Sequence, residues 1–183
     1  MTEGWRSTLL HLATSMLMIV IVVGVSRARR LPLRSFLGLR WPGARQTASW
    51  VVLFVVLVIA EEMAAGPLGL GKPEPWGGRY AGWLLALRIV GMVVLAPAGE
   101  ELVFRGALFS RIAASRLGPA GAIVIPAILF ALVHVQYPAP EMMLVAVDGL
   151  FYGLARWRTG SVLVPMLLHS LGNGYAVYQR LFG

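Results

Sequence analysis

Three charged residues lie close together in the middle of a chain that is otherwise strongly apolar. The run Gly99–Gly106 reads Gly-Glu-Glu-Leu-Val-Phe-Arg-Gly, and its charges are Glu100, Glu101 and Arg105. Charged side chains are costly inside a bilayer, so those found within apolar segments usually have a function. On a helix, Glu101 and Arg105 are spaced i, i+4 and can form an ion pair, whereas Glu100 points about 100° away. The spacing therefore predicts a structural role for Glu101 and a chemical role for Glu100.

Two of the three histidines begin or end pairs of residues with helical spacing. Phe130 precedes His134 by four residues, and Asn173 follows His169 by four. Each pair places its two side chains on one face of a helix. A carboxylate and two imidazoles are sufficient to activate a water molecule and to stabilise an oxyanion. His134 and His169 are therefore candidate catalytic residues, while the third histidine is expected to form an ordinary hydrogen bond between helices.

The residue inventory excludes several other catalytic classes. The sequence has no cysteine, so a thiol nucleophile and a thiolate metal site are excluded. It also has no GxSG-like serine site and no HExxH motif, and a single aspartate, Asp148, cannot form an aspartyl dyad. We expect Asp148 to form a hydrogen bond between helices. A zinc site made of Glu100, His134 and His169 remains stereochemically possible, because these are ordinary zinc ligands.

The composition is that of an integral membrane protein. Of the 183 residues, 58% are hydrophobic and 13% are charged, compared with about 25% charged residues in soluble domains. The net charge of +8 comes from basic residues at the ends of apolar runs, where they anchor helices and set their orientation. We therefore expect the lipid bilayer as a partner and expect no nucleic acid.

Apolar runs separated by short polar or Gly/Pro-rich segments predict about seven membrane spans. They cover residues 9–25, 50–65, 80–96, 98–117, 120–135, 141–157 and 162–183. Residues 31–45 carry arginines among apolar residues and are expected to lie at the membrane interface. Pro97 suits a first helical turn, so Ala96–Gly99 is expected to break the chain and to start a new helix. A second acidic doublet, Glu61-Glu62, has no arginine four residues on and is interpreted as a solvated helix end.

The predicted fold class is all-α, a polytopic transmembrane helix bundle with a recessed polar active site. One membrane domain is expected over residues 1–183, with N-terminal spans in 1–95 and a catalytic core in 96–180. The expected spans put Glu100 and His134 on one side of the membrane, and the six arginines from Arg27 to Arg45 indicate that this side is cytoplasmic. Four arginines at the far ends of the spans indicate the opposite: Arg111, Arg116, Arg156 and Arg158. The larger group favours a cytoplasmic opening.

The order of three motifs resembles that of the CPBP family, which comprises CAAX prenyl proteases and bacteriocin-processing proteins formerly called Abi. EExxxR contains Glu100, Glu101 and Arg105, FxxxH contains Phe130 and His134, and HxxxN contains His169 and Asn173. The resemblance covers residues 96–178 and is closest in kind to the CAAX endopeptidases of the Ras-converting type. It implies a glutamate-dependent intramembrane endopeptidase without a metal or another cofactor.

The resemblance also implies a role for each motif residue. Glu100 with His134 would deprotonate the attacking water, and His169 with Asn173 would stabilise the oxyanion. A supporting group would hold the site in shape: Glu101, Arg105 and Phe130. The implied substrate is a membrane-associated peptide or protein, such as a prenylated CaaX-like tail, a leader peptide or a sorting tag, and the expected location is the plasma membrane of a bacterium.

Three alternatives remain at this point. The same polar cluster could serve packing in a catalytically inactive membrane immunity or scaffold protein, although intact motifs argue against this. The Glu/His/His set could act as a zinc-dependent protease. A small transporter is disfavoured, because the sequence shows no internal repeat.

Overall fold

The computed structural model describes residues 2–70, 73–80 and 82–183 and is helical, without strands in these ranges. The N-terminal part contains α1 (Thr2–Ala28), the short α2 (Leu33–Leu37), α3 (Ala44–Ala65) and a 3₁₀ turn, η1 (Gly77–Arg79). The next part contains α4 (Gly82–Val90), α5 (Ala96–Glu101) and α6 (Phe109–Ala113), joined by the π-helical segments η2 (Gly91–Leu95) and η3 (Leu102–Leu108). The C-terminal part contains α7 (Gly118–Leu132), α8 (Ala139–Thr159) and α9 (Leu163–Phe182).

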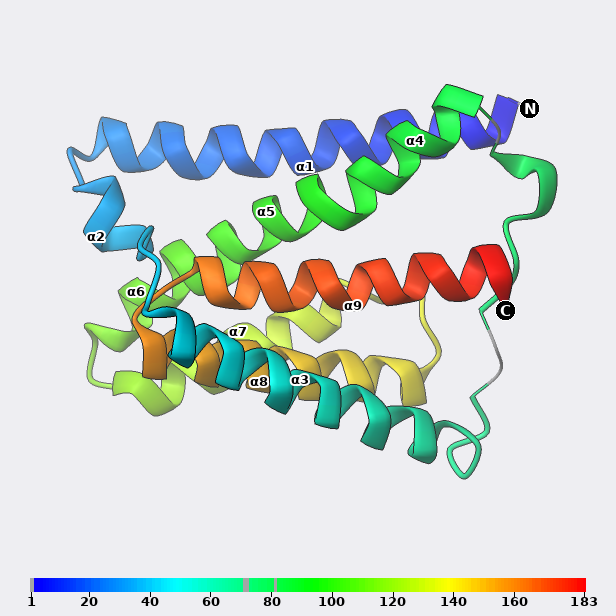
Figure 1. Ribbon diagram of the computed structural model, residues 1–183. Coiled ribbons are helices and arrows are strands. Elements are labelled where there is room, and N and C mark those ends of the chain that lie inside the picture. The colour runs from blue at the N-terminus through cyan, green and yellow to red at the C-terminus, as the bar shows by residue number, and fades with distance from the viewer. Residues whose placement is uncertain (1, 71–72, 81) are drawn as a thin grey trace.

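The helices form one bundle, which confirms the predicted all-α membrane fold (Figure 1). α1 and α3 lie on opposite outer sides, α9 runs between them, and the run from α4 to α6 crosses the bundle obliquely. Three helical stretches are long and apolar enough to cross a bilayer: Gly4–Ala28, Ala44–Ala65 and Gly82–Ala113. Both chain ends lie at the same end of the bundle.

The predicted break at Ala96–Gly99 is wrong, because residues 82–113 form one continuous helix of 32 residues. Pro97 lies in the first turn of α5 and has no backbone N–H. The π-helical turn η2 just before it shifts the hydrogen-bond register, so the helix continues through the proline. At 1.5 Å per residue this helix is about 48 Å long, which exceeds the roughly 30 Å of bilayer hydrocarbon. Tilting is one way to accommodate a helix of this length, and Figure 1 shows that it runs obliquely to α1 and α9.

Small residues allow this helix and its neighbours to approach closely. A Cβ atom added to Gly99 would lie 2.8 Å from the carbonyl oxygen of Ser15 on α1. A Cβ atom added to Gly149 on α8 would lie 3.0 Å from the Cα atom of Ala127 on α7. Close backbone approach of this kind is how helices associate in lipid, where apolar burial adds little.

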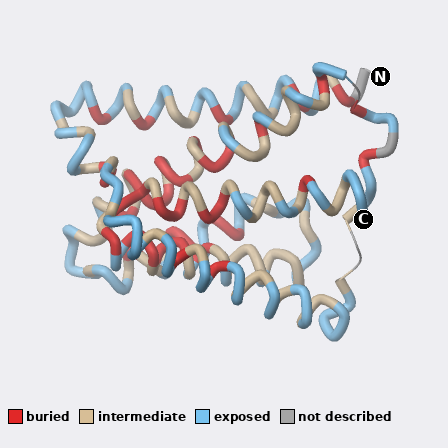
Figure 2. The backbone as a smooth tube through the Cα atoms, viewed as in Figure 1, coloured by how far each residue is buried: buried red, intermediate tan, exposed pale blue. Residues whose placement is uncertain are grey.

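The burial pattern is that of a protein surrounded by lipid. Figure 2 shows buried positions gathered in the interior of the bundle, whereas α1 and α3 are exposed along most of their length. The exposed side chains of these two helices are largely apolar, for example Leu10, Val20, Val52 and Val56. Such a surface suits hydrocarbon and would be a large apolar patch in water. The chain is an integral membrane protein.

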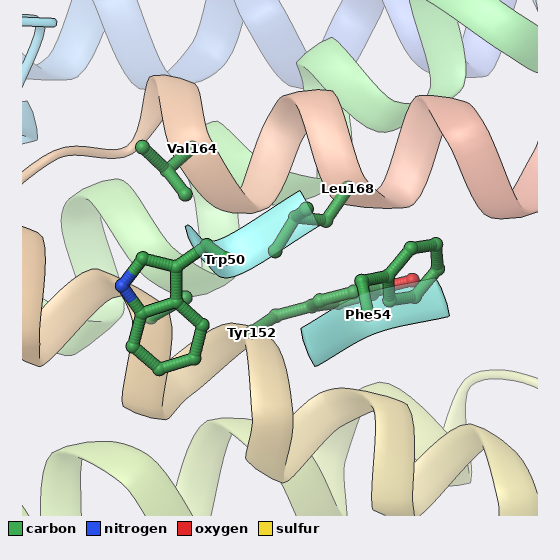
Figure 3. Close-up of a cluster of buried hydrophobic side chains, with 6 residues drawn as sticks. Trp50, Phe54, Tyr152, Val164 and Leu168 are labelled. Atoms are coloured by element: carbon green, nitrogen blue, oxygen red, sulfur yellow. The ribbon is translucent and has the colours of Figure 1, made fainter. Parts of the chain in front are cut away.

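One buried apolar cluster positions the C-terminal half of the site. It joins α3, α8 and α9, and Figure 3 shows its members Trp50, Phe54, Tyr152, Val164 and Leu168. Leu168 and Val164 are fully buried, so α9 is fixed in rotation against the other two helices. The residue that follows Leu168 is the last histidine of the sequence motifs.

Candidate active site

Glu101 and Arg105 form the buried i, i+4 ion pair that the sequence predicts. Nη1 of Arg105 donates to Oε1 of Glu101 at 2.9 Å, and both side chains are fully buried. Nη2 of Arg105 donates to the carbonyl oxygen of Gly149 at 2.9 Å. The guanidinium carbon also lies 4.6 Å from the ring centroid of Phe130 and 5.4 Å from that of Tyr152. Arg105 therefore joins its own helix to α7 and α8.

His169 lies between the two glutamates. Its Nδ1 is 3.0 Å from Oε1 of Glu101, and its Nε2 is 3.7 Å from Oε2 of Glu100. Since the carboxylate paired with arginine can only accept, Nδ1 carries the hydrogen and Nε2 is the atom left for chemistry. The imidazole stacks on Tyr152 with ring centroids 5.4 Å apart, and the edge-on contact with Phe130 measures 5.6 Å.

The two adjacent glutamates have different environments. Oε1 of Glu101 accepts hydrogen bonds from both Arg105 and His169, and the side chain is 0% exposed. The side chain of Glu100 is 18% exposed, and its closest charged partner is Nε2 of His169. In the part of the chain that the structure describes, no hydrogen bond holds the Glu100 carboxylate. Glu101 thus has a structural role, because both Arg105 and His169 bind its carboxylate. Glu100 is the carboxylate that remains partly exposed.

His134 lies two residues beyond the end of α7, and its Nδ1 has a different partner from that of His169. Its Nδ1 lies 2.7 Å from the carbonyl oxygen of Phe130. Because a carbonyl oxygen only accepts, Nδ1 carries the hydrogen and the lone pair of Nε2 is free. The ring also packs edge-on against Phe130, with centroids 4.7 Å apart. Phe130 thus packs against both imidazoles, and no hydrogen bond or ion pair between described residues joins His134 to Glu100.

Asn173 satisfies a backbone carbonyl that the helix itself leaves unpaired. The N–H of Ala96 donates to the carbonyl oxygen of Gly91 in the π-helical register. The next donor in that register would be Pro97, which has no N–H, so the carbonyl oxygen of Met92 lacks a helical partner. Nδ2 of Asn173 donates to this oxygen at 2.8 Å. One amide hydrogen of Asn173 is therefore bound to the backbone, and the other remains for a ligand.

A cavity of about 210 Å³ adjoins these residues and is lined by His134, His169 and Asn173. Three acidic residues in its wall were not assigned to the site from the sequence: Glu61 and Glu62 of α3, and Asp148 of α8. Oε1 of Glu61 and Oδ1 of Asp148 are buried without a hydrogen-bond partner among the described residues. Interpreting Glu61 as a solvated helix end is therefore wrong, whereas Glu62 is exposed and accepts from Gln179 at 2.8 Å.

The sequence did contain a signal for Glu61. Phe54, Val58 and Glu61 are spaced i, i+4, i+7 and all three line the cavity. This spacing places them on one face of α3. Glu100 is not among the lining residues, but it lies 3.7 Å from His169, which is one of them.

A family model described as type II CAAX prenyl endopeptidase, Rce1-like, matches residues 82–175. The match covers just over half of the chain and includes all three motifs. The chain belongs to this family. No curated protein matches it, and no solved structure does. Family membership makes the protein a membrane protease of the CAAX endopeptidase type, as the motifs had indicated.

The zinc alternative requires Glu100, His134 and His169 to converge on one point. Among the residues that the structure describes, no group of three or more His, Asp or Glu side chains is arranged to hold a metal ion. His169 instead directs Nδ1 at Glu101, and both histidine rings pack edge-on against Phe130.

The role of Asn173 at the unpaired carbonyl can be tested by its effect on stability. In Asn173→Ala the Met92 carbonyl loses its donor at a partly buried position, so the free energy of unfolding should fall by about 1 kcal/mol. Unfolding of the purified protein in detergent measures this change. Gln46→Ala is the matched control, because its exposed amide also donates to a backbone carbonyl, at 3.3 Å. Equal effects of the two variants would show that Asn173 does not support the helix.

Proposed function

We propose that this CAAX endopeptidase family member is a glutamate-dependent intramembrane protease that hydrolyses a peptide bond of a membrane-associated polypeptide. The observation that carries the proposal is the difference between two neighbouring carboxylates. Glu101 is buried and holds Arg105 and His169, while Glu100 is partly exposed, forms no hydrogen bond with the described residues and lies 3.7 Å from His169. A base that must accept a proton needs such an uncommitted carboxylate.

In the proposed reaction Glu100 takes one proton from a water molecule as the water oxygen bonds to the carbonyl carbon of the substrate. The tetrahedral intermediate then collapses, the C–N bond breaks, and the proton passes from Glu100 to the departing amine. The two histidines differ in a way that suits two roles. Nε2 of His134 is an acceptor, because Nδ1 is held by a carbonyl oxygen, and it can assist in orienting and deprotonating the water.

The oxyanion requires donors, and His169 with Asn173 can supply them. The carboxylate of Glu101 binds Nδ1 of His169 and stabilises an imidazolium, whose Nε2–H would then donate to the oxyanion. Asn173 lines the same cavity as His169, and its second amide hydrogen would add another donor. Glu101, Arg105 and Phe130 hold these groups in place.

The proposed substrate is a polypeptide at the membrane, with or without a lipid anchor, and the proposed location is the plasma membrane of a bacterium. The direct test is cleavage of a quenched fluorescent peptide by the purified protein in liposomes, using a farnesylated CaaX peptide and the same peptide without the lipid. Cleavage of either peptide supports a protease. Failure to cleave these peptides, together with unchanged membrane peptides in cells that lack the active protein, would favour the inactive scaffold.

A chelator distinguishes the glutamate mechanism from the zinc mechanism. Purified protein dialysed against 1,10-phenanthroline should keep its full peptidase activity, because the proposed base and donors are protein groups alone. A zinc metalloprotease treated in parallel should lose its activity and regain it with added zinc. The same loss and recovery in this protein would replace the glutamate mechanism with a zinc-dependent one.

A further inference from the structure

Three connections between helices meet at one end of the bundle. They are residues 29–43 between α1 and α3, residues 114–117 between α6 and α7, and residues 160–162 between α8 and α9 (Figure 1). Hydrogen bonds tie the first connection to the third: Nη2 of Arg40 donates to the carbonyl oxygen of Thr159 at 3.0 Å, and the N–H of Val162 donates to that of Gly38 at 2.9 Å. Ser110 of α6 donates to the carbonyl oxygen of Phe36. These segments therefore lie on the same side of the membrane.

This end, named the arginine end here, carries most of the basic residues. Ten of the 16 Lys and Arg residues lie in these connections or in the adjoining helix turns: Arg27, Arg29, Arg30, Arg34, Arg40, Arg45, Arg111, Arg116, Arg156 and Arg158. The described residues toward the other end add four, Arg6, Arg79, Arg88 and Arg180, while Arg105 lies inside the bundle. The one remaining basic residue, Lys72, is outside the described ranges and could raise that count to five at most.

An excess of Lys and Arg in short connections marks the cytoplasmic side of a membrane protein. The arginine end has ten basic residues and the other end at most five, which is a clear excess. The two groups of arginines, which the sequence placed on opposite sides of the membrane, now indicate the same side. That conflict arose because residues 82–113 were expected to cross the membrane twice. As one helix they cross once, so the second group of arginines lies at the same end as the first.

The active-site cavity extends toward the opposite end. Glu61, Glu62 and Tyr137 line both the 210 Å³ cavity beside His169 and a second cavity of about 890 Å³. The second cavity is bounded by segments that lie at that opposite end: Pro73, Glu74, Trp76, Gln136, Pro138 and Arg180. Toward the arginine end the interior is instead filled by a packed apolar cluster that includes Leu37, Leu102 and Val162.

We propose that the active site opens on the non-cytoplasmic face of the membrane. Resting on the proposed protease function, this means that the substrates are translocated polypeptides, cleaved in a segment that has crossed the membrane, and not cytoplasmic lipidated tails. The sequence predicted a cytoplasmic opening because residues 82–113 were counted as two spans. The structure shows one helix there, so that prediction loses its basis.

Cysteine labelling tests the orientation without any assay of activity. The chain has no cysteine, and α7 provides a matched pair of exposed positions on either side of it, Ser115 and Gln136. In spheroplasts, a membrane-impermeant maleimide should label Gln136→Cys directly and Ser115→Cys only after lysis. Glu74→Cys and Ser35→Cys, also exposed, repeat the comparison on two other segments. The reverse pattern, or reaction of both ends from the same side, overturns the proposal.

The substrate class has a separate readout. Membrane peptides from cells that make the wild-type protein are compared by mass spectrometry with those from cells that make Glu100→Gln. Peptides that depend on Glu100 should map to non-cytoplasmic segments of membrane proteins. If they map to cytoplasmic tails, the proposed substrate class is wrong while the protease stands. If no peptide differs while the labelling holds, the orientation stands and the protease proposal fails.

Discussion

Glu100→Gln should remove peptidase activity and leave the protein folded. The amide has nearly the shape of the carboxylate but cannot accept the proton of the attacking water, and a lost general base costs about 10²–10⁴-fold in rate. Stability should change little, because no hydrogen bond between described residues holds the Glu100 carboxylate. The initial rate of peptide cleavage in liposomes measures the effect, and unfolding in detergent checks the fold.

Glu74→Gln makes the same chemical change at an exposed residue away from the histidines and serves as the control. It should cleave at the wild-type rate. A Glu100→Gln protein that cleaves within about tenfold of wild type would assign the base to another group, and Nε2 of His134 is the next candidate, because its lone pair is free.

Glu101→Gln should destabilise the protein, in contrast to the same substitution one residue earlier. It leaves Arg105 as a fully buried guanidinium without a counter-charge, and removing one partner of a buried ion pair costs about 3–5 kcal/mol. It also weakens the hold on Nδ1 of His169, so peptidase activity should fall as well. The free energy of unfolding, measured in detergent for both variants, gives the comparison.

The double variant Glu101→Leu/Arg105→Leu distinguishes the contribution of the ion pair from the cost of leaving one charge unpaired. Replacing both charges avoids the uncompensated cation, so it should be more stable than Glu101→Gln even though the hydrogen bond to Gly149 is lost. Equal stability of wild type and Glu101→Gln would show that the ion pair contributes little. Neither result bears on the assignment of Glu100.

Local spacing predicted the parts of the site that depend on a single helix. The Glu101–Arg105 pair and the shared face of Phe130 and His134 follow from i, i+4 spacing, and both are present. The contact between His169 and Glu101 joins residues 68 apart in the chain, and no periodicity could have revealed it. For the same reason the sequence did not show that Asp148 and Glu61 face one cavity.

The path of the chain around Pro97 could not be predicted for a different reason. A proline after a small apolar run normally marks a helix start, and a π-helical turn leaves no trace in composition. Here the turn and the amide of Asn173, which is 76 residues further on, together satisfy the backbone that proline would otherwise leave unpaired. The resulting error of one span reversed the expected side of every later connection.

The long tilted helix also makes the site depend on the thickness of the bilayer. Glu100 is carried by a helix of 32 residues, whereas His134 follows α7, which has 15 residues and is too short to span the hydrocarbon. A thinner bilayer increases the tilt of the longer helix but has no such effect on the shorter one. We therefore expect lipid chain length to change the separation of Glu100 and His134, so that the bilayer would affect the alignment of the two groups.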